Sequence, residues 1–288
     1  MTPSRPPTRR QVLRGYLLLP HAVPIIVVMS ATAAFALIAS GGWPGAGTMA
    51  RLLGAMLGGQ LAIGAVNELV DVELDRVAKP HKPIPAGLVS TRGAWLMTAA
   101  ALLAMVILSA TFGLASLLLC SLGTGTGIAY SLWFKRTIWS WVPYLVALPL
   151  LPIWVWEALG EVDPGIFAVY PIGALAVVAV QIAQSLPDIA GDRATGVRTL
   201  AVVLGGRRAT LACWGSTLAA TALASALAPW LTDRPVWLWL AAAIATVLVT
   251  VNVAIHRRDP SAGVRMCFPL VASAVVVLGV GWGLAIVA

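Results

Sequence analysis

The sequence predicts an all-α integral membrane protein with nine transmembrane helices. First, 59% of the 288 residues are hydrophobic and 10% are charged, and the mean hydropathy is +0.90. Soluble domains have about 45–50% apolar and about 25% charged residues. Second, apolar runs of membrane length continue to the C-terminal end of the chain. Third, Lys and Arg alternate between the connecting segments, as in a chain that crosses a membrane repeatedly.

Each crossing needs about 20 consecutive apolar residues. Lipid cannot satisfy free backbone N–H and C=O groups, and the apolar runs do not alternate as barrel strands do, so we expect α-helices. The candidate transmembrane helices are 16–40, 49–69, 93–112, 114–133, 139–159, 165–186, 208–231, 235–256 and 265–287.

The positive charges test this count. With nine crossings, all Lys and Arg except Arg51 and Arg234 fall on one side of the membrane. The positive-inside rule makes that side cytoplasmic. We therefore expect a multi-pass protein of the cell membrane, with a basic cytoplasmic tail at 1–15 and the C-terminus on the opposite side. No separate soluble domain is left over, so 1–288 is expected to be a single membrane domain.

The net charge of +8 follows from this topology and from attraction to anionic lipids or substrates. It therefore requires no nucleic-acid partner, and the sequence gives no sign of an obligate protein partner.

A cluster of acidic residues follows the second candidate helix, in the stretch "NELVDVELD". At about 100° per residue, four of its polar residues lie within an arc of about 100°, whereas Glu73 points away from them. These four are Asn67, Glu68, Asp71 and Asp75. The stretch is about 12 Å long, which is too long for one small ion to be bound by both ends.

A second acidic pair follows the sixth candidate helix, in "QSLPDIAGDRATGVRTLAVVLG". Asp188 and Asp192 are four residues apart and share a face if this turn is helical. Both acidic groups lie on the cytoplasmic side. Because clustered carboxylates repel one another, they need a compensating charge. Mg²⁺ prefers oxygen ligands and is typically bound by one or two carboxylates together with substrate phosphates. The pattern therefore favours metal ions that bridge to a diphosphate.

These two motifs resemble the aspartate-rich motifs of the UbiA superfamily of intramembrane prenyltransferases. The first is "NELVDVELD" followed by "KPHKPIPAG", and the second is "DIAGDRATGVRTLAVVLG". The helix count, the placement of the motifs after helices two and six, and a Tyr130…Lys135-Arg136 element after helix four extend the resemblance over nearly the whole chain. Glu68 stands where many members of the superfamily have Asp.

The resemblance implies helices bundled around a central lipid-open cavity, with Mg²⁺ and a prenyl diphosphate at its cytoplasmic mouth. It implies transfer of the isoprenoid chain to a lipophilic acceptor, such as a quinone or aromatic precursor, through an allylic carbocation. The catalytic carboxylates it implies are Asp71, Asp75, Asp188 and Asp192. The metal ligands it implies are Asn67, Glu68, Asp71, Asp75, Asp188 and Asp192. The diphosphate-binding residues it implies are Tyr130, Lys135, Arg193 and Arg198.

Two other functions are compatible with the sequence. A cyclase of the same fold would use a prenyl diphosphate without any acceptor. A non-enzymatic transporter would use the carboxylates for cation transit, but transporters usually bind their substrates near the bilayer midplane. Both acidic groups here lie at one membrane edge, which argues against transport.

The distribution of Lys and Arg predicts which loops face outward. Cysteines introduced by Gly45→Cys and Val162→Cys should react with a membrane-impermeant thiol reagent on intact cells. A cysteine introduced by Pro80→Cys should react only after permeabilisation, because residue 80 lies on the side that carries nearly all the positive charge. Labelling of residue 80 from outside would contradict the nine-helix topology.

Overall fold

The computed structural model describes residues 7–20, 22–162 and 164–287, which form helices and connecting loops with no β-strand among them. The all-α prediction is therefore confirmed. The helices are α1 (Arg9–Leu18), α2 (Ala22–Ala39), α3 (Ala46–Ala78), α4 (Thr91–Ala110), α5 (Leu114–Ala129), η1 (Tyr130–Phe134), α6 (Val142–Leu159), η2 (Pro164–Ala168), α7 (Val169–Ser185), η3 (Leu186–Asp188), α8 (Ile189–Ala194), α9 (Leu200–Leu204), α10 (Gly206–Leu231), α11 (Val236–Arg258) and α12 (Pro260–Val287).

Within the described residues, eight helical segments are long and apolar enough to cross a membrane. They agree with eight of the nine expected spans to within a few residues, except that α3 and the segment Ile166–Ala194 continue well past their expected ends. The ninth apolar helix, α2, is shorter in its apolar part, at Pro24–Ala39. The chain is therefore a multi-pass membrane protein, and the expected count of nine corresponds to eight long helices and one short one.

The first expected span, 16–40, is wrong as a continuous helix. The helix that contains Tyr16 begins at Arg9 and ends at Leu18, and α2 begins at Ala22. Pro20 lies in the break, where its ring nitrogen has no hydrogen to donate to an earlier carbonyl. Thr8 caps the start of α1 and forms a reciprocal capping box with Gln11.

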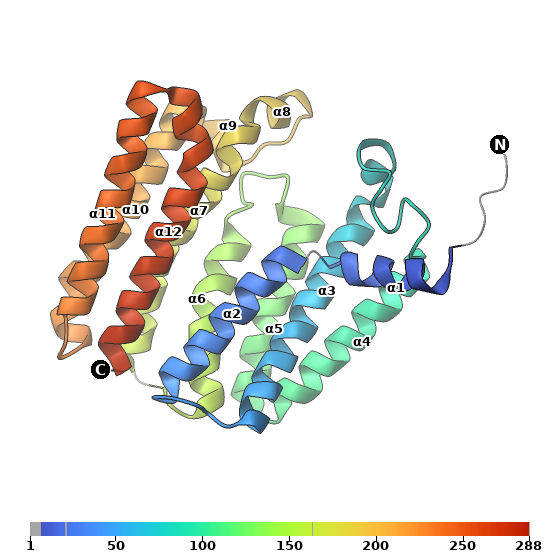
Figure 1. Ribbon diagram of the computed structural model, residues 1–288, viewed down its shortest axis with the longest axis horizontal. Helices are drawn as coiled ribbons and strands as arrows, with labels where there is room; N and C mark the ends of the chain where they lie inside the picture. The colour runs from blue at the N-terminus through green and yellow to red at the C-terminus, as the bar shows by residue number, and fades with distance from the viewer. Residues whose placement is uncertain (1–6, 21, 163, 288) are drawn as a thin grey trace. The chain divides into compact units, whose positions relative to one another are not determined.

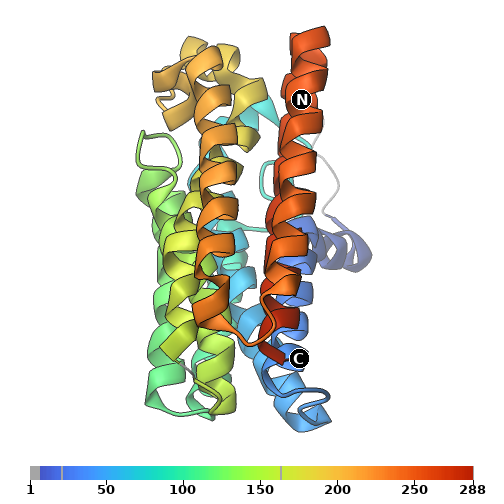
Figure 2. The same cartoon turned by 90° about the vertical axis from the view of Figure 1, so that its left-hand side faces the viewer.

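The structure divides into two compact units, and the first comprises Met1–Leu132 with Trp154–Glu161. In this unit α3 packs against α2, α4 and α5. Helix α1 crosses the direction of these helices (Figures 1 and 2). The second unit comprises Trp133–Ile153 and Val162–Ala288. There α7, α10, α11 and α12 pack side by side, and the short α8 and α9 follow the end of α7.

Helices α3 and α4 approach closely because Gly58 has no side chain. A Cβ atom at this position would lie 2.6 Å from the backbone oxygen of Ala101 and 2.9 Å from the backbone nitrogen of Met105. Small residues at such positions allow membrane helices to pack backbone to backbone. The α3–α4 contact thus supports the helix that carries the first acidic motif.

Helix α3 is longer than a membrane crossing requires. Its 33 residues span about 50 Å, compared with a hydrocarbon core of about 30 Å. The sequence predicts that this helix ends near residue 69, but it continues to Ala78. The whole stretch Asn67–Asp75 is therefore held on a rigid helix.

The α3–α4 contact can be tested at Gly58. We expect Gly58→Ala to lower stability by ~1–3 kcal/mol, because its Cβ would meet backbone atoms that cannot move independently of α4. The measurement is the thermal unfolding midpoint of the purified protein in detergent. Gly125→Ala is the matched control, since nothing lies within 4 Å of a Cβ at that position. Equal midpoints for the two variants would contradict the close contact.

Candidate active site at the end of α3

The first acidic motif divides into an inward and an outward part. Glu68 and Asp75 are only 2% and 3% exposed, although both are carboxylates. Glu73 lies on the other face of α3, with 81% of its side chain exposed, and pairs with Arg76 at 3.0 Å. Asn67 and Asp71 are half-buried. Helical geometry thus separates Glu73 from the other four polar residues, as the sequence predicts.

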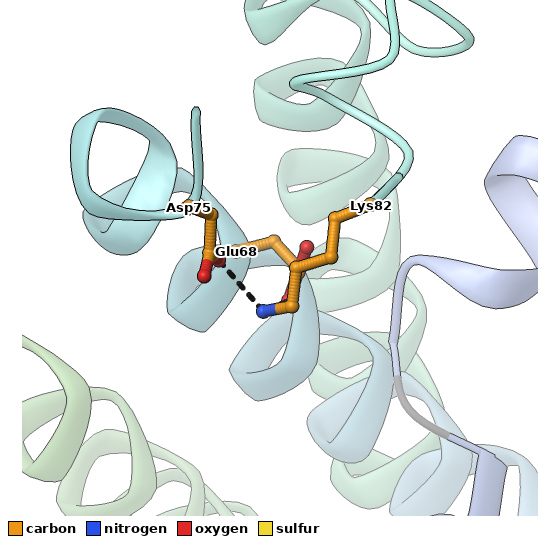
Figure 3. Close-up of polar contacts among 3 residues, drawn as sticks. All are labelled: Glu68, Asp75 and Lys82. Atoms are coloured by element: carbon orange, nitrogen blue, oxygen red, sulfur yellow. Dashed lines mark hydrogen bonds and ion pairs between the residues drawn. The ribbon is translucent and has the colours of Figure 1, made fainter. Parts of the chain in front are cut away.

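Lys82 lies between the two buried carboxylates (Figure 3). Its Nζ atom is 2.6 Å from Oε1 of Glu68 and 2.7 Å from Oδ2 of Asp75. Only 15% of the lysine side chain is exposed. Ion pairs of this length are charge-assisted hydrogen bonds. Lys82 therefore supplies part of the charge compensation that the sequence analysis assigns to metal alone.

The charged state of Lys82 follows from its surroundings. Burial of the side chain by itself lowers its pKa. The hydrogen bonds from Lys82 to Asp75 and Glu68, together with their negative charges, outweigh burial and raise the pKa above the ordinary value for lysine. The stability that the ion pairs of Lys82 contribute to the folded protein is therefore fully present at neutral pH. It is lost only as the pH rises through the raised pKa of Lys82.

The loop that carries Lys82 is packed against the core of the first unit. Ile84 and Val89 are buried in a cluster with Leu19, Ala65 and Val72. The amide of Ala86 donates to the carbonyl oxygen of Lys82 at 2.9 Å, and the amide of Lys82 donates to that of Lys79 at 3.0 Å. The backbone at Lys82 is thus fixed, and only its side chain reaches the carboxylates.

Helix α1 packs closely against the end of this loop at Gly15. A Cβ atom on Gly15 would lie 2.9 Å from Cβ of Leu88 and 3.0 Å from Cγ2 of Val89, so a larger residue here would press on the loop. At Gly87 the φ angle is +71°, a conformation that glycine adopts without strain. The turn that places Lys82 therefore depends on contacts that are distant in sequence.

The donor set fits a divalent cation. Among the described residues, no three His, Cys, Asp or Glu side chains are gathered as a single metal site. Mg²⁺, however, commonly uses only one or two protein carboxylates and completes its shell with water and phosphate oxygens. Glu68 and Asp75 already hold the ammonium group of Lys82 between them. The space between these two side chains thus accommodates a positive charge bound by oxygen.

The second motif lies in the second unit, on a short helical turn. Asp188 ends η3 and precedes α8, and Asp192 is on α8, so the i, i+4 spacing falls on helical backbone despite Pro187 and Gly191. Asp188 is exposed, and Asp192 is half-buried.

Arg193 and Arg198 lie close by in the chain. The guanidinium of Arg193 donates to the carbonyl oxygen of Val202 at 3.5 Å, and the amide of Arg198 donates to that of Arg136 at 3.1 Å. The second bond ties the turn after α8 to the segment that follows Lys135. Tyr130 begins the π-helix η1, and Lys135 directly follows it. Single π-helical turns of this kind occur frequently at functional sites.

Sequence reasoning did not place Lys82 in the candidate site. Its positive charge is explained equally well by membrane topology, as for Arg76 and Lys79 in the same stretch. Periodicity relates residues on one helix, but it does not relate a loop residue to a helix face. The available signal was a single lysine among Pro80, Pro83 and Pro85, in a short rigid segment directly after an acidic helix.

The sequence and the fold both match known proteins. A model of the UbiA prenyltransferase family matches residues 27–274. The chain belongs to the UbiA prenyltransferase family. Its relatives are named as prenyltransferases and synthases, so it is an enzyme of the prenyltransferase class.

Relatives with different names have about the same percent identity to the chain. Digeranylgeranylglyceryl phosphate synthase of Halobacterium salinarum is 31% identical over 221 residues, which cover 75% of this chain and 78% of the relative. The bacteriochlorophyll synthase 33 kDa chain of Cereibacter sphaeroides is 32% identical over 249 residues, covering 78% and 77%. A UbiA homologue from Archaeoglobus fulgidus, solved with GPP and Mg²⁺, has a TM-score of 0.61 at 17% identity, covering 93% of this chain and 98% of that one.

Proposed function

We propose that this UbiA-family enzyme is a Mg²⁺-dependent prenyltransferase that transfers an isoprenoid chain from a prenyl diphosphate to a lipophilic acceptor. The observation that carries the proposal is the pair of buried carboxylates, Glu68 and Asp75, at the end of the membrane-spanning helix α3. They hold the positively charged ammonium group of Lys82 between them. The family to which the chain belongs supplies the reaction class. The homologue from Archaeoglobus fulgidus, solved with GPP and Mg²⁺, supports the choice of donor and metal.

In the proposed reaction, the bond between the allylic carbon and the diphosphate oxygen breaks, and the diphosphate leaves with the electron pair. The acceptor then forms a new bond to the allylic carbon and loses a proton. Mg²⁺, when bound, offsets the negative charge that develops on the leaving diphosphate. The remaining contributions come from side chains of the protein.

The oxygen atoms of the two motifs are proposed to hold the metal-bound diphosphate. In the first motif these belong to Asn67, Glu68, Asp71 and Asp75, and in the second to Asp188 and Asp192. Lys135, Arg193 and Arg198 add fixed positive charge for the phosphate oxygens, and Tyr130 adds a hydroxyl donor. The apolar membrane helices keep water from the carbocation and accommodate the prenyl chain.

The acceptor is proposed at the level of chemical class only. Relatives named for an archaeal lipid and for bacteriochlorophyll are 31% and 32% identical to the chain, so percent identity alone favours neither. A lipophilic acceptor, such as a quinone or aromatic precursor or a similar lipid, is consistent with a membrane-embedded site. The proposed site opens on the cytoplasmic side, together with the N-terminus, because the flanking loops carry most of the Lys and Arg.

The substrates can be determined with purified protein in lipid nanodiscs. The assay supplies Mg²⁺, prenyl diphosphates of several chain lengths and a panel of lipophilic acceptors, and product is detected by mass spectrometry. We expect prenylated acceptor, formed together with diphosphate. Cyclised product without any acceptor would instead support the alternative of a terpene cyclase.

Substitutions in the motifs test the assigned roles. We expect Asp71→Ala and Asp192→Ala to reduce turnover by ~10²–10³-fold while the protein stays folded. Each removes an oxygen ligand just as charge develops on the diphosphate, and losing one preorganised stabiliser of such charge costs ~2.7–4 kcal/mol. Turnover and the thermal unfolding midpoint are measured with and without Mg²⁺.

Glu73→Ala is the matched control within the first motif. Its side chain is 81% exposed on the opposite face of α3, so this variant should remain active. Normal turnover in Asp71→Ala and Asp192→Ala, or unfolding of all three variants, would contradict the assignment.

A further inference from the structure

The ammonium group of Lys82 lies where the first motif is expected to bind metal. We propose that Lys82 is an internal counter-ion of Glu68 and Asp75, and that a divalent cation competes with it for these two carboxylates. The inference rests on the proposed function for the identity of the competing cation. The ion pairs themselves are features of the structure.

The ammonium and a bound metal ion would occupy the same space. Glu68 and Asp75 are seven residues apart on α3, about two helical turns, yet one Nζ atom is within 2.7 Å of an oxygen from each. The ammonium therefore lies between the two carboxylates, and one small cation does contact residues near both ends of the stretch. The expectation from the length of the helix is wrong here because the two side chains extend toward each other along the helix. A Mg²⁺ ion bound by both would lie about 2.0–2.1 Å from its oxygen ligands, in the same space. A single position cannot hold both cations, and two cations on the same oxygens repel each other.

In the metal-free state the two carboxylates need a compensating positive charge. Glu68 and Asp75 are almost completely buried, and removing one partner of a buried ion pair leaves an uncompensated charge. Lys82 supplies that compensation and holds both carboxylate side chains in place before any metal binds. The protein thus maintains a negatively charged site without losing the packing around it.

The lysine side chain can leave the carboxylates while the loop stays in place. Ile84 and Val89 anchor the loop in the core beside α3. The backbone at Lys82 therefore stays in place when its side chain moves away from the carboxylates. Lysine has a flexible four-carbon stem that ends in a compact charge. Rotation of this stem is sufficient to release the carboxylates, and the ammonium stays near them afterwards. Arginine, with its rigid planar fork, would be less suited to such an exchange.

The first experiment uses the unaltered protein and chemical labelling of lysine. The chain has only three lysines, at positions 79, 82 and 135, so each can be followed by mass spectrometry after brief reductive methylation. Without metal, we expect Lys82 to react more slowly than Lys79, which is exposed on the same loop. Saturating Mg²⁺ should increase labelling of Lys82 and leave that of Lys79 unchanged. Unchanged labelling of Lys82 in Mg²⁺ would overturn the competition.

The second experiment removes the competing charge. We expect Lys82→Met to bind Mn²⁺ about fivefold or more tightly than the unaltered protein, measured by the electron paramagnetic resonance signal of free Mn²⁺. The same variant should have a lower thermal unfolding midpoint without metal, and a larger increase on adding metal. Lys79→Met is the matched control and should leave both quantities unchanged. Equal or weaker Mn²⁺ binding by Lys82→Met would overturn the proposal.

If Lys82→Met does not fold, Lys82→Gln replaces it, because its amide can still donate to a carboxylate without carrying charge. The two proposals fail in different ways. Absence of Mn²⁺ binding in every form of the protein would overturn the metal assignment of the proposed function, and the competition with it. Metal-dependent turnover together with unchanged Mn²⁺ affinity in the Lys82 variant would overturn the competition alone.

Discussion

The candidate site depends on one constraint, which is that two carboxylates are buried at the end of a membrane helix. Burying one charged group costs several kcal/mol unless a partner compensates it. Glu68 and Asp75 meet this requirement through Lys82, which reaches both at hydrogen-bond distance. The length of α3 and the packed loop that follows it are both needed for this arrangement. The acidic motif is thus part of how the unit is held together as well as the candidate site of its chemistry.

Several features of the first unit serve this constraint. Gly58 allows α3 to pack closely against α4, and this contact supports α3, which continues past the apolar segment. Ile84 and Val89 fix the loop on the same core, and Gly15 lets α1 pack closely against its end. The side chains expected to meet substrate therefore rest on rigid backbone. Such support is what a site needs to stabilise charge that develops during a reaction.

Much of the fold could be predicted from sequence, because hydropathy and charge distribution report directly on membrane crossing. The broken first span could not, since the apolar composition of 16–40 hides the effect of Pro20 on the helix. Helical periodicity separated Glu73 from its neighbours correctly. It gave no information on Lys82, whose contact with α3 depends on a turn and on packing between segments that are distant in sequence. Pairwise contacts of this kind follow from tertiary structure rather than from local pattern.

The metal dependence of prenyl transfer is the most direct test of the proposed carboxylate site. The measurement is diphosphate release by the purified protein from a prenyl diphosphate, with the acceptor present, first in excess chelator and then after Mg²⁺ is restored. We expect chelation to abolish release and Mg²⁺ to restore it, because the candidate ligands are hard oxygen donors. Undiminished release in excess chelator would contradict the assignment of the carboxylate motifs to a metal-bound diphosphate.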